Sequence, residues 1–244
     1  MSTGADPRRD ELAHRLSEVR GRIAAACADA GRDPGEVTLI AVTKTYPAGD
    51  VRRLVDLGVH DIGENKDQEA APKAAELAAA EALVRWHFVG QLQRNKAKSV
   101  VGYADLVHSV DSVPLAAALD RAAARQRERP LDVLVQVSLD GDLDRGGAAS
   151  GADVPERDLD RVVAAVAGSG SLRLRGVMTV APLSWDPPSA YERLAEVAHA
   201  LRGEHPAATV VSAGMSADLE AAIAAGATHV RIGSALLGKR PPLR

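Results

Sequence analysis

The chain alternates between two hydrophobic patterns along most of its length. Short runs rich in Val, Ile and Leu, typical of buried strands, are each followed by a segment with apolar residues at helical spacing. The expected strands cover residues 37–43, 60–63, 86–90, 105–110, 131–138, 174–180, 208–212 and 228–233. The expected helices that follow them cover residues 48–58, 66–80, 93–101, 113–128, 156–168, 188–203 and 216–226, with a short helical tail after the last strand.

This succession of eight strand–helix units predicts a parallel sheet. At this chain length it fits an α/β fold of the TIM (β/α)8 barrel type, with a doubly wound open sheet as the alternative. An amphipathic helix is expected first, over residues 8–31, because apolar residues recur there at helical spacing. No linker divides the chain, so we expect a single domain over residues 1–244, with the barrel at 37–238.

Composition and charge narrow the function classes. The chain is 46% hydrophobic, with a net charge of −3 at pH 7 and a pI of about 6.2, which argues against a general nucleic-acid binder. Its single cysteine, Cys27, cannot form an intrachain disulfide. We see no signal-peptide core and no apolar run near the ~20 residues of a membrane span. We therefore expect a cytoplasmic protein without nucleic-acid or membrane partners.

One acidic loop resembles a calcium site but lacks two of its requirements. Asp140, Asp142 and Asp144 alternate as calcium ligands would, in the sequence DGDLDRG. However, Arg145 stands at the position of the required glycine, and Gly151 at that of the bidentate glutamate. The histidines show no zinc spacing either, so we expect no metal site.

Candidate chemistry follows several of the expected strands. Lys44, in LIAVTKTYP, comes just after the first strand, GEN (63–65) after the second, SAGMS (212–216) after the seventh, and IGS (232–234) closes the eighth. The carboxyl ends of barrel strands carry the active sites of TIM barrels. Burial at a strand tip disfavours an ammonium, so Lys44 could act as an amine nucleophile that forms a Schiff base. A rim lysine paired with a carboxylate is the alternative.

Two of these loops predict a phosphate site. Gly214 permits a tight turn, and Ser216 suits the N-cap of the next helix, whose free N–H groups could bind phosphate. Gly233 and Ser234 offer a close-approach glycine and a hydroxyl after the eighth strand. Loops after strands seven and eight often bind phosphate in TIM barrels. Ordinary capping and turn chemistry is the alternative.

An arginine lies within the last expected strand. Alternation places His229 and Arg231 on one face and Val230 and Ile232 on the other. An arginine that points into a barrel mouth needs a partner, such as a ligand's ring nitrogen, a phosphate or the carboxylate of Glu64. A lysine amine, a phosphate site and an inward arginine together suggest a phosphorylated aldehyde, and pyridoxal 5′-phosphate fits. An arginine at its ring nitrogen would keep that nitrogen unprotonated and weaken the ring as an electron sink.

Six stretches carry a family resemblance over nearly the whole chain: AVTKTYP, IGENKDQEA, WHFVGQLQRNK, VHSVDS, GVMTVAP and SAGMSADLEAAIAAGATHVRIGSALLG. They resemble the pyridoxal phosphate homeostasis proteins, a family similar to the N-terminal barrel of alanine racemase. The resemblance implies that Lys44 carries the cofactor as an aldimine. It implies that Asn65 and Arg231 approach the cofactor ring and that His87 lies near the cofactor face. It also implies a phosphate end formed by Ser212, Met215, Ser216, Gly233 and Ser234.

Some positions depart from the family pattern. Lys66 follows GEN where the family often has another residue, Ala213 replaces a common methionine, and Arg145 stands where a lysine is frequent. None of these changes removes a proposed ligand. They bear instead on the exposed face and on the loop at 138–151.

The resemblance favours a binding protein over an enzyme. We expect a monomer that holds pyridoxal phosphate in vitamin B6 homeostasis and delivers it to pyridoxal-phosphate-dependent apoenzymes. Racemase catalysis needs proton donors on both faces of the cofactor, and the second comes by resemblance from a C-terminal domain that we expect to be absent here, since the chain ends at Arg244. The alternatives are a racemase or related enzyme, completed by another subunit or by His87, and a cofactor-free Schiff-base aldolase.

Overall fold

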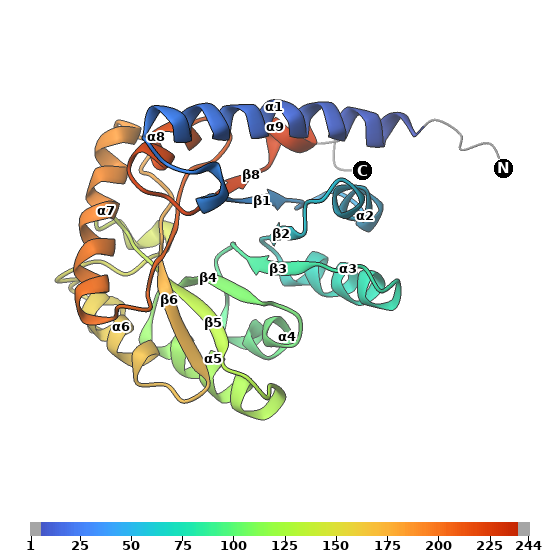
Figure 1. Cartoon of the computed structure of the whole chain (residues 1–244). Coiled ribbons are helices and arrows are strands. Elements are labelled where there is room, and N and C mark those ends of the chain that lie inside the picture. The colour runs from blue at the N-terminus through green and yellow to red at the C-terminus, as the bar shows by residue number, and fades with distance from the viewer. Residues whose placement is uncertain (1–5, 239–244) are drawn as a thin grey trace.

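The computed structural model describes residues 6–238, which form a closed barrel of eight parallel strands in chain order (Figure 1). The strands are β1 (Thr38–Val42), β2 (Asp61–Glu64), β3 (Arg85–Phe88), β4 (Leu106–Val110), β5 (Leu131–Gln136), β6 (Leu172–Met178), β7 (Val210–Ser212) and β8 (His229–Ile232). Pairing of β8 with β1 closes the ring. The TIM-barrel prediction is therefore confirmed, and the open-sheet alternative is wrong.

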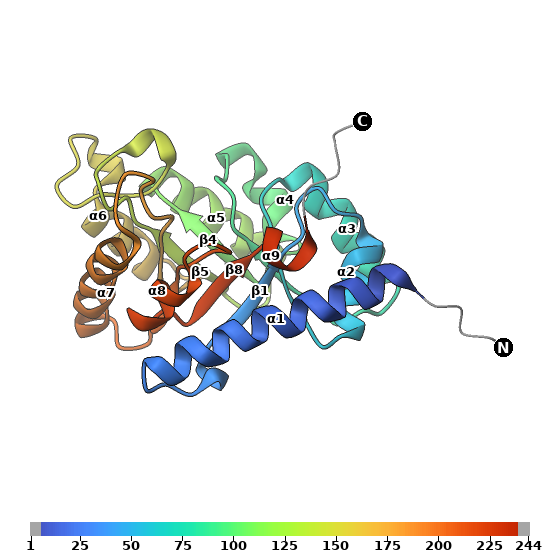
Figure 2. The same ribbon diagram turned by 90° about the horizontal axis from the view of Figure 1, so that it is seen from above.

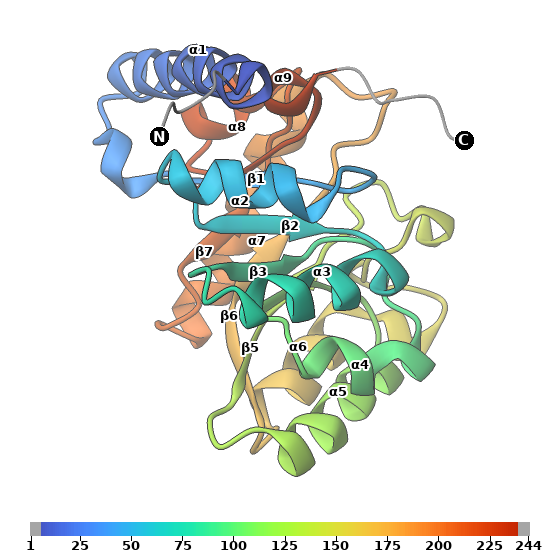
Figure 3. The ribbon, with the colours of Figure 1, turned by 90° about the vertical axis from the view of Figure 1, so that its right-hand side faces the viewer.

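Helices surround the barrel and alternate with its strands. They are α1 (Pro7–Asp29), α2 (Ala48–Asp56), α3 (Asp67–Ala79), α4 (Ala97–Val101), α5 (Val113–Gln126), α6 (Leu159–Ala167), α7 (Pro187–Glu204), α8 (Leu219–Ala224) and α9 (Ser234–Leu237). Figure 3 shows α2, α3, α4 and α5 following one another around the outside. Their apolar faces pack on the outward side chains of the strands and form the main core.

The inside of the barrel is largely polar. Val230 and Ile232 of β8 pack in the outer apolar layer with α1, whereas His229 and Arg231 contact inward side chains of other strands. The predicted alternation of β8 is thus confirmed. Apolar side chains fill the rest of the interior, among them a small cluster of Leu106, Leu134 and Met178.

The N-terminal helix α1 completes the ring of helices. The helix that follows β8, α9, has only four residues and covers little of the barrel wall. Helix α1 lies across the seam between β8 and β1, next to α8 and α9 (Figures 1 and 2). Its buried stripe, formed by Leu12, Leu16, Val19 and Ile23, belongs to the same apolar cluster as Ala41 of β1. Among residues 6–238, no helix is long and apolar enough to cross a membrane.

Candidate functional site

The predicted site residues converge on one side of the barrel mouth. Lys44 lies two residues beyond β1, Asn65 directly follows β2, and Gly233 directly follows β8. The loop at 213–218 follows β7. Strands β7, β8, β1 and β2 are hydrogen-bonded neighbours in that order. The four loops therefore meet at adjacent carboxyl ends of the sheet, where TIM barrels carry their chemistry.

Lys44 sits on a strained turn. The amide of Tyr46 donates to the carbonyl of Thr43 at 3.0 Å, which makes Lys44 and Thr45 the central residues of the turn. Thr45 has a φ of 71°, a region that favours glycine and costs a β-branched residue roughly 1–3 kcal/mol. Such strain persists only where surrounding contacts hold it. The conformation at Lys44 is therefore imposed by its neighbours.

Helix α3 supplies those contacts. Glu69 accepts a hydrogen bond from the amide of Thr45 at 2.8 Å, and Lys73 donates to the carbonyl of Thr43 at 2.9 Å. The peptide groups on both sides of Lys44 are thus held by side chains one helical turn apart. The sequence signal for this clamp was present in KDQEAAPK, where Glu69 and Lys73 share a helix face at i, i+4.

A buried ion pair anchors the clamp to the barrel. Lys73 also contacts Oε1 of Glu64 at 2.7 Å, and the hydroxyl of Thr43 donates to the same oxygen at 2.6 Å. Burial raises the pKa of Glu64, while Lys73 and the Thr43 hydroxyl oppose that rise. Oε1 of Glu64 has these partners and Oε2 has none among the described residues, whereas Arg231 donates to Ser212 and Thr179; Glu64 is therefore not the partner of Arg231 that the sequence allowed.

Asn65 presents an unpaired polar atom beside this turn. Its Oδ1 is buried and has no hydrogen-bond partner among the described residues. The backbone of Asn65 packs closely against position 90, which requires glycine because a Cβ there would lie 2.1 Å from the Asn65 carbonyl oxygen. A buried polar atom without a partner is costly. Oδ1 of Asn65 can therefore accept a hydrogen bond from a ligand.

The expected N-cap at Ser216 is wrong. Helix α8 begins only at Leu219, because Asp218 accepts a hydrogen bond from the amide of Met215 at 2.6 Å and closes a turn before the helix. The hydroxyl of Ser216 instead accepts from the amide of Ala235 at 3.2 Å. It thereby ties the loop after β7 to the loop after β8.

These two loops nevertheless leave backbone donors available. The amides of Ser216, Gly233 and Ser234 have no hydrogen-bond acceptor among residues 6–238. Gly214 has a φ of 86°, and a Cβ there would lie 2.7 Å from the Cβ of Ala222, so the turn requires glycine. Several free N–H groups in adjacent loops are the kind of donors that bind an anion such as phosphate.

Arg231 lies below the mouth, inside the barrel. Its Nη1 donates to the hydroxyl of Ser212 and its Nη2 to the carbonyl of Thr179, each at 2.7 Å. Burial lowers the pKa of Arg231 to about 10. No carboxylate of the described residues forms an ion pair with it. Arg231 is thus a buried cation whose contacts in the protein are all neutral.

His87 and Ser212 lie deeper than the other predicted residues. His87 is 2% exposed, and its Nδ1 lies 2.9 Å from Nε2 of His108. Its Nε2 lies 2.9 Å from Oδ1 of Asp61. Nδ1 of His108 in turn lies 2.9 Å from Oγ of Ser212. Both residues are engaged inside the barrel, so the structure gives them no free group at the mouth.

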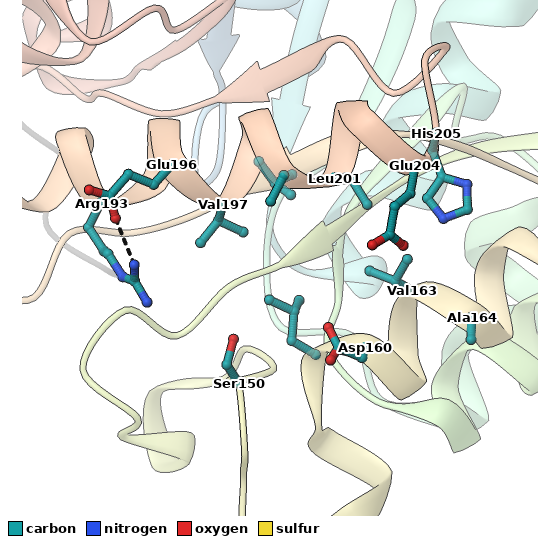
Figure 4. A pocket seen from close by; sticks show the side chains of 13 residues that line it. Ser150, Asp160, Val163, Ala164, Arg193, Glu196, Val197, Leu201, Glu204 and His205 are labelled. Carbon is teal, nitrogen blue, oxygen red and sulfur yellow. Dashed lines mark hydrogen bonds and ion pairs between the residues drawn. The ribbon is translucent and has the colours of Figure 1, made fainter.

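One surface hollow lies next to this site and another lies far from it. One, of about 540 Å³, adjoins the mouth and is lined by Asn65, Gln91, Gln93 and Lys96. The other, a groove of about 690 Å³, lies between α6 and α7 on the outer layer, where Ser150, Asp160, Val197 and Glu204 line it (Figure 4). The groove is distant in the fold from the strand ends that carry Lys44, and it contains none of the predicted site residues.

The chain is similar in sequence and in fold to proteins of one family. The family model for the alanine racemase N-terminal domain matches residues 10–241. The pyridoxal phosphate homeostasis protein of Mycobacterium leprae is 46% identical, over 95% of this chain and 93% of its own. PipY of Synechococcus elongatus PCC7942, solved with PLP bound, is 33% identical with a TM-score of 0.76, over 93% of this chain and all of that chain. Alanine racemase from Corynebacterium glutamicum has a TM-score of 0.67 and 17% identity, over 97% of this chain and 63% of that one, a likeness of fold alone.

The clamp leads to a stability prediction. Lys73→Met should lower the free energy of unfolding by about 2–4 kcal/mol, because it leaves Glu64 buried without its cation and the Thr43 carbonyl without its donor. Lys66→Met is the matched control, since Lys66 is 63% exposed and its ion pair with Glu69 is long, at 3.9 Å. This variant should change the free energy of unfolding by less than about 0.5 kcal/mol. Urea unfolding at pH 7 measures both. Equal stability of the two variants would contradict the clamp.

The buried histidines lead to a pH prediction. Burial, with a smaller effect of nearby His87, lowers the pKa of His229 to about 4. An unfolded histidine has a pKa near 6.5, so below that pH the unfolded chain binds a proton that the folded chain does not. This contribution to stability is complete above pH 6.5 and falls by about 2 kcal/mol between pH 7 and pH 5. His229→Gln should show a shallower loss of stability with falling pH, measured by urea unfolding.

His14→Gln is the control for this pH series. His14 is 76% exposed on α1, so its replacement should leave the pH dependence of unfolding unchanged. A slope in His229→Gln identical to that of the wild type would show that His229 is protonated in the folded barrel.

Proposed function

The chain belongs to the family of pyridoxal phosphate homeostasis proteins, which share the barrel of the alanine racemase N-terminal domain, and we propose that it binds pyridoxal 5′-phosphate covalently on Lys44. Its role is to hold the cofactor in intracellular vitamin B6 homeostasis. The observation that carries this proposal is the strained, clamped turn at Lys44, which faces a rim with unpaired backbone donors and an unpaired buried acceptor.

The residues at the rim fit this cofactor. The amine of Lys44 would hold the aldehyde, and the amides of Ser216, Gly233 and Ser234 would hold the phosphate, with Gly214 and Met215 shaping that loop. The unpaired Oδ1 of Asn65 supplies an acceptor for a polar edge of the ring. When bound, the cofactor supplies an electrophilic aldehyde and an electron-accepting ring.

Arg231 fits the ring nitrogen. A guanidinium can only donate hydrogen bonds, so an arginine at that nitrogen favours its unprotonated form. With a pKa of about 10, Arg231 remains a cation at neutral pH and cannot supply a proton there. This arrangement weakens the ring as an electron sink, which suits holding a cofactor better than turning over a substrate. Ser212 and His87 support Arg231 from below instead of touching the cofactor.

The tyrosines also favour binding over turnover. Tyr46 donates to the carbonyl of Gly238 at 3.0 Å. Burial raises the pKa of Tyr103, and burial together with a hydrogen bond to Asp218 raises the pKa of Tyr191. A phenol that is hard to ionise is a poor general base at neutral pH. The chain's three tyrosines thus give little support to the two-base chemistry of a racemase.

Delivery follows from the chemistry of the covalent bond. Lys44 would hold the aldehyde through a reversible bond, which would allow release of the cofactor to the lysine of an apoenzyme without oxidation or reduction. We infer that the recipients are pyridoxal-phosphate-dependent apoenzymes of the cytoplasm and that the protein acts as a monomer.

Covalent capture tests the binding proposal. Wild-type protein mixed with pyridoxal phosphate should turn yellow, and borohydride should fix the cofactor on the peptide that contains Lys44, as mass spectrometry would show. Lys44→Ala should lose the visible band and the fixed adduct, while Lys66→Ala, at the same rim, should keep both. A colourless wild type without an adduct would overturn the proposal and leave a substrate Schiff base as the role of Lys44.

Transfer and turnover assays separate a carrier from an enzyme. Loaded wild type should restore activity to a pyridoxal-phosphate-dependent apoenzyme, and in D2O it should introduce no deuterium at Cα of alanine. Lys44→Ala mixed with the same amount of cofactor should behave as free cofactor does. Racemisation or Cα exchange that disappears in Lys44→Ala would contradict the carrier role and favour a racemase.

A further inference from the structure

A continuous chain of polar side chains crosses the inside of the barrel. It runs from Asp61, the first residue of β2, through His87 of β3 and His108 of β4, and then across the interior to Ser212 of β7 and Arg231 of β8. Its links measure 2.9, 2.9, 2.9 and 2.7 Å in that order. The chain starts at the amino end of one strand and ends at the arginine below the mouth.

If both imidazoles are neutral, the two ends of this hydrogen-bonded chain fix the direction of every hydrogen bond in it. Arg231 can only donate, so Oγ of Ser212 accepts from it. The carboxylate of Asp61 can only accept, so Nε2 of His87 donates to it. With neutral imidazoles, Nδ1 of His87 then accepts from Nε2 of His108, and Nδ1 of His108 accepts from the hydroxyl of Ser212. Burial lowers the pKa of His108 well below its usual range, which keeps that ring neutral.

Each donor thus points away from Arg231 and toward Asp61. Such a one-way chain links a buried cation to a distant anion, and its members polarise one another in the low-dielectric interior. Arg231 has no carboxylate partner of its own among the described residues, and its other hydrogen bond ends on the carbonyl of Thr179. The hydrogen-bonded chain therefore connects Arg231 to the carboxylate of Asp61, a negative charge that its direct contacts do not provide.

We propose that Asp61, His87 and His108 are positioning residues for the cofactor's ring end, acting through Ser212 and Arg231. The inference rests on the proposed function, because it assigns Arg231 to the ring nitrogen. It implies that the hydroxyl proton of Ser212 is directed at His108 and is not offered to a phosphate. It also makes a carboxylate at the far end of the barrel a determinant of cofactor binding.

Asp218, which accepts a hydrogen bond from Tyr191, acts on Arg231 only through its charge, and two further groups lie close to the hydrogen-bonded chain. The exposed side chain of Arg85 contacts Oδ1 of Asp61, with an N–O distance of 3.2 Å. This contact keeps that oxygen an acceptor. The ring of His229 lies 6.3 Å from that of His87 and bonds to the hydroxyl of Thr228 at 2.9 Å. Neither group interrupts the chain.

The hydrogen positions can be measured without any cofactor. Long-range 1H–15N correlation spectra of the 15N-labelled protein should show His87 and His108 both protonated at Nε2 and bare at Nδ1. Asp61→Asn replaces an obligate acceptor by an amide that can also donate, so Nδ1-protonated forms of both rings should appear. A wild-type His108 protonated at Nδ1 would overturn the proposed direction.

Cofactor binding provides the functional test. Asp61→Asn should raise the Kd for pyridoxal phosphate about three- to tenfold, the scale of one weakened charge-assisted hydrogen bond, and should shift the visible band of the bound form. Asp132→Asn is the matched control, because Asp132 near the start of β5 pairs with Arg173 and Arg175 and not with the histidines; its Kd should equal that of the wild type. An Asp61→Asn protein with an unchanged Kd and band would overturn the positioning role.

The outcomes separate the two proposals. A wild type that shows the predicted ring protonation but binds no pyridoxal phosphate would remove the proposed function and leave the chain as a structural feature. A wild type that binds the cofactor with affinity independent of Asp61 would keep the function and remove the positioning role.

Discussion

The arrangement of this barrel depends on the burial of one cation without a countercharge in contact. Arg231 is 5% exposed, and burying an ion is costly unless its hydrogen bonds are made. The inward residues of several other strands provide for it: a carbonyl after β6, a hydroxyl on β7 and, through that hydroxyl, two imidazoles and a carboxylate. The need to satisfy this group explains why part of the interior is polar where most protein cores are apolar.

The backbone at Lys44, at the barrel mouth, is held from outside the barrel. Instead of a chain through the interior, a helix outside the barrel grips the backbone on both sides of Lys44 through Glu69 and Lys73. Backbone strain at Thr45 is the result. Lys44 is thereby positioned by main-chain geometry, which a bound ligand cannot easily displace, while its side chain stays half-buried at the end of β1.

The fold could be predicted from the sequence because its signals are local. Hydrophobic periodicity located every strand and helix within a few residues, and strand alternation assigned the inward face of β8. Depth inside the barrel was not predictable, since His87 and Ser212 share the inward face with rim residues yet lie below them. The partners Asp61 and His108 come from separate strands, and their contact depends on how the sheet closes. The start of α8 was missed because Asp218 and Ser216 compete for the same turn, which residue preference alone does not decide.

The helix across the seam has a consequence for how the chain acquires its structure. The apolar stripe of α1 packs against β8, α8 and α9, which are synthesised after all the other described elements of the barrel. Until they appear, α1 has no complete surface to cover, and β1 lacks its neighbour on one side. Contacts between such distant segments close slowly, and exposed strand edges and apolar stripes invite aggregation in the interval. The barrel therefore becomes a closed, protected unit only after β8 and the helices next to it have been synthesised.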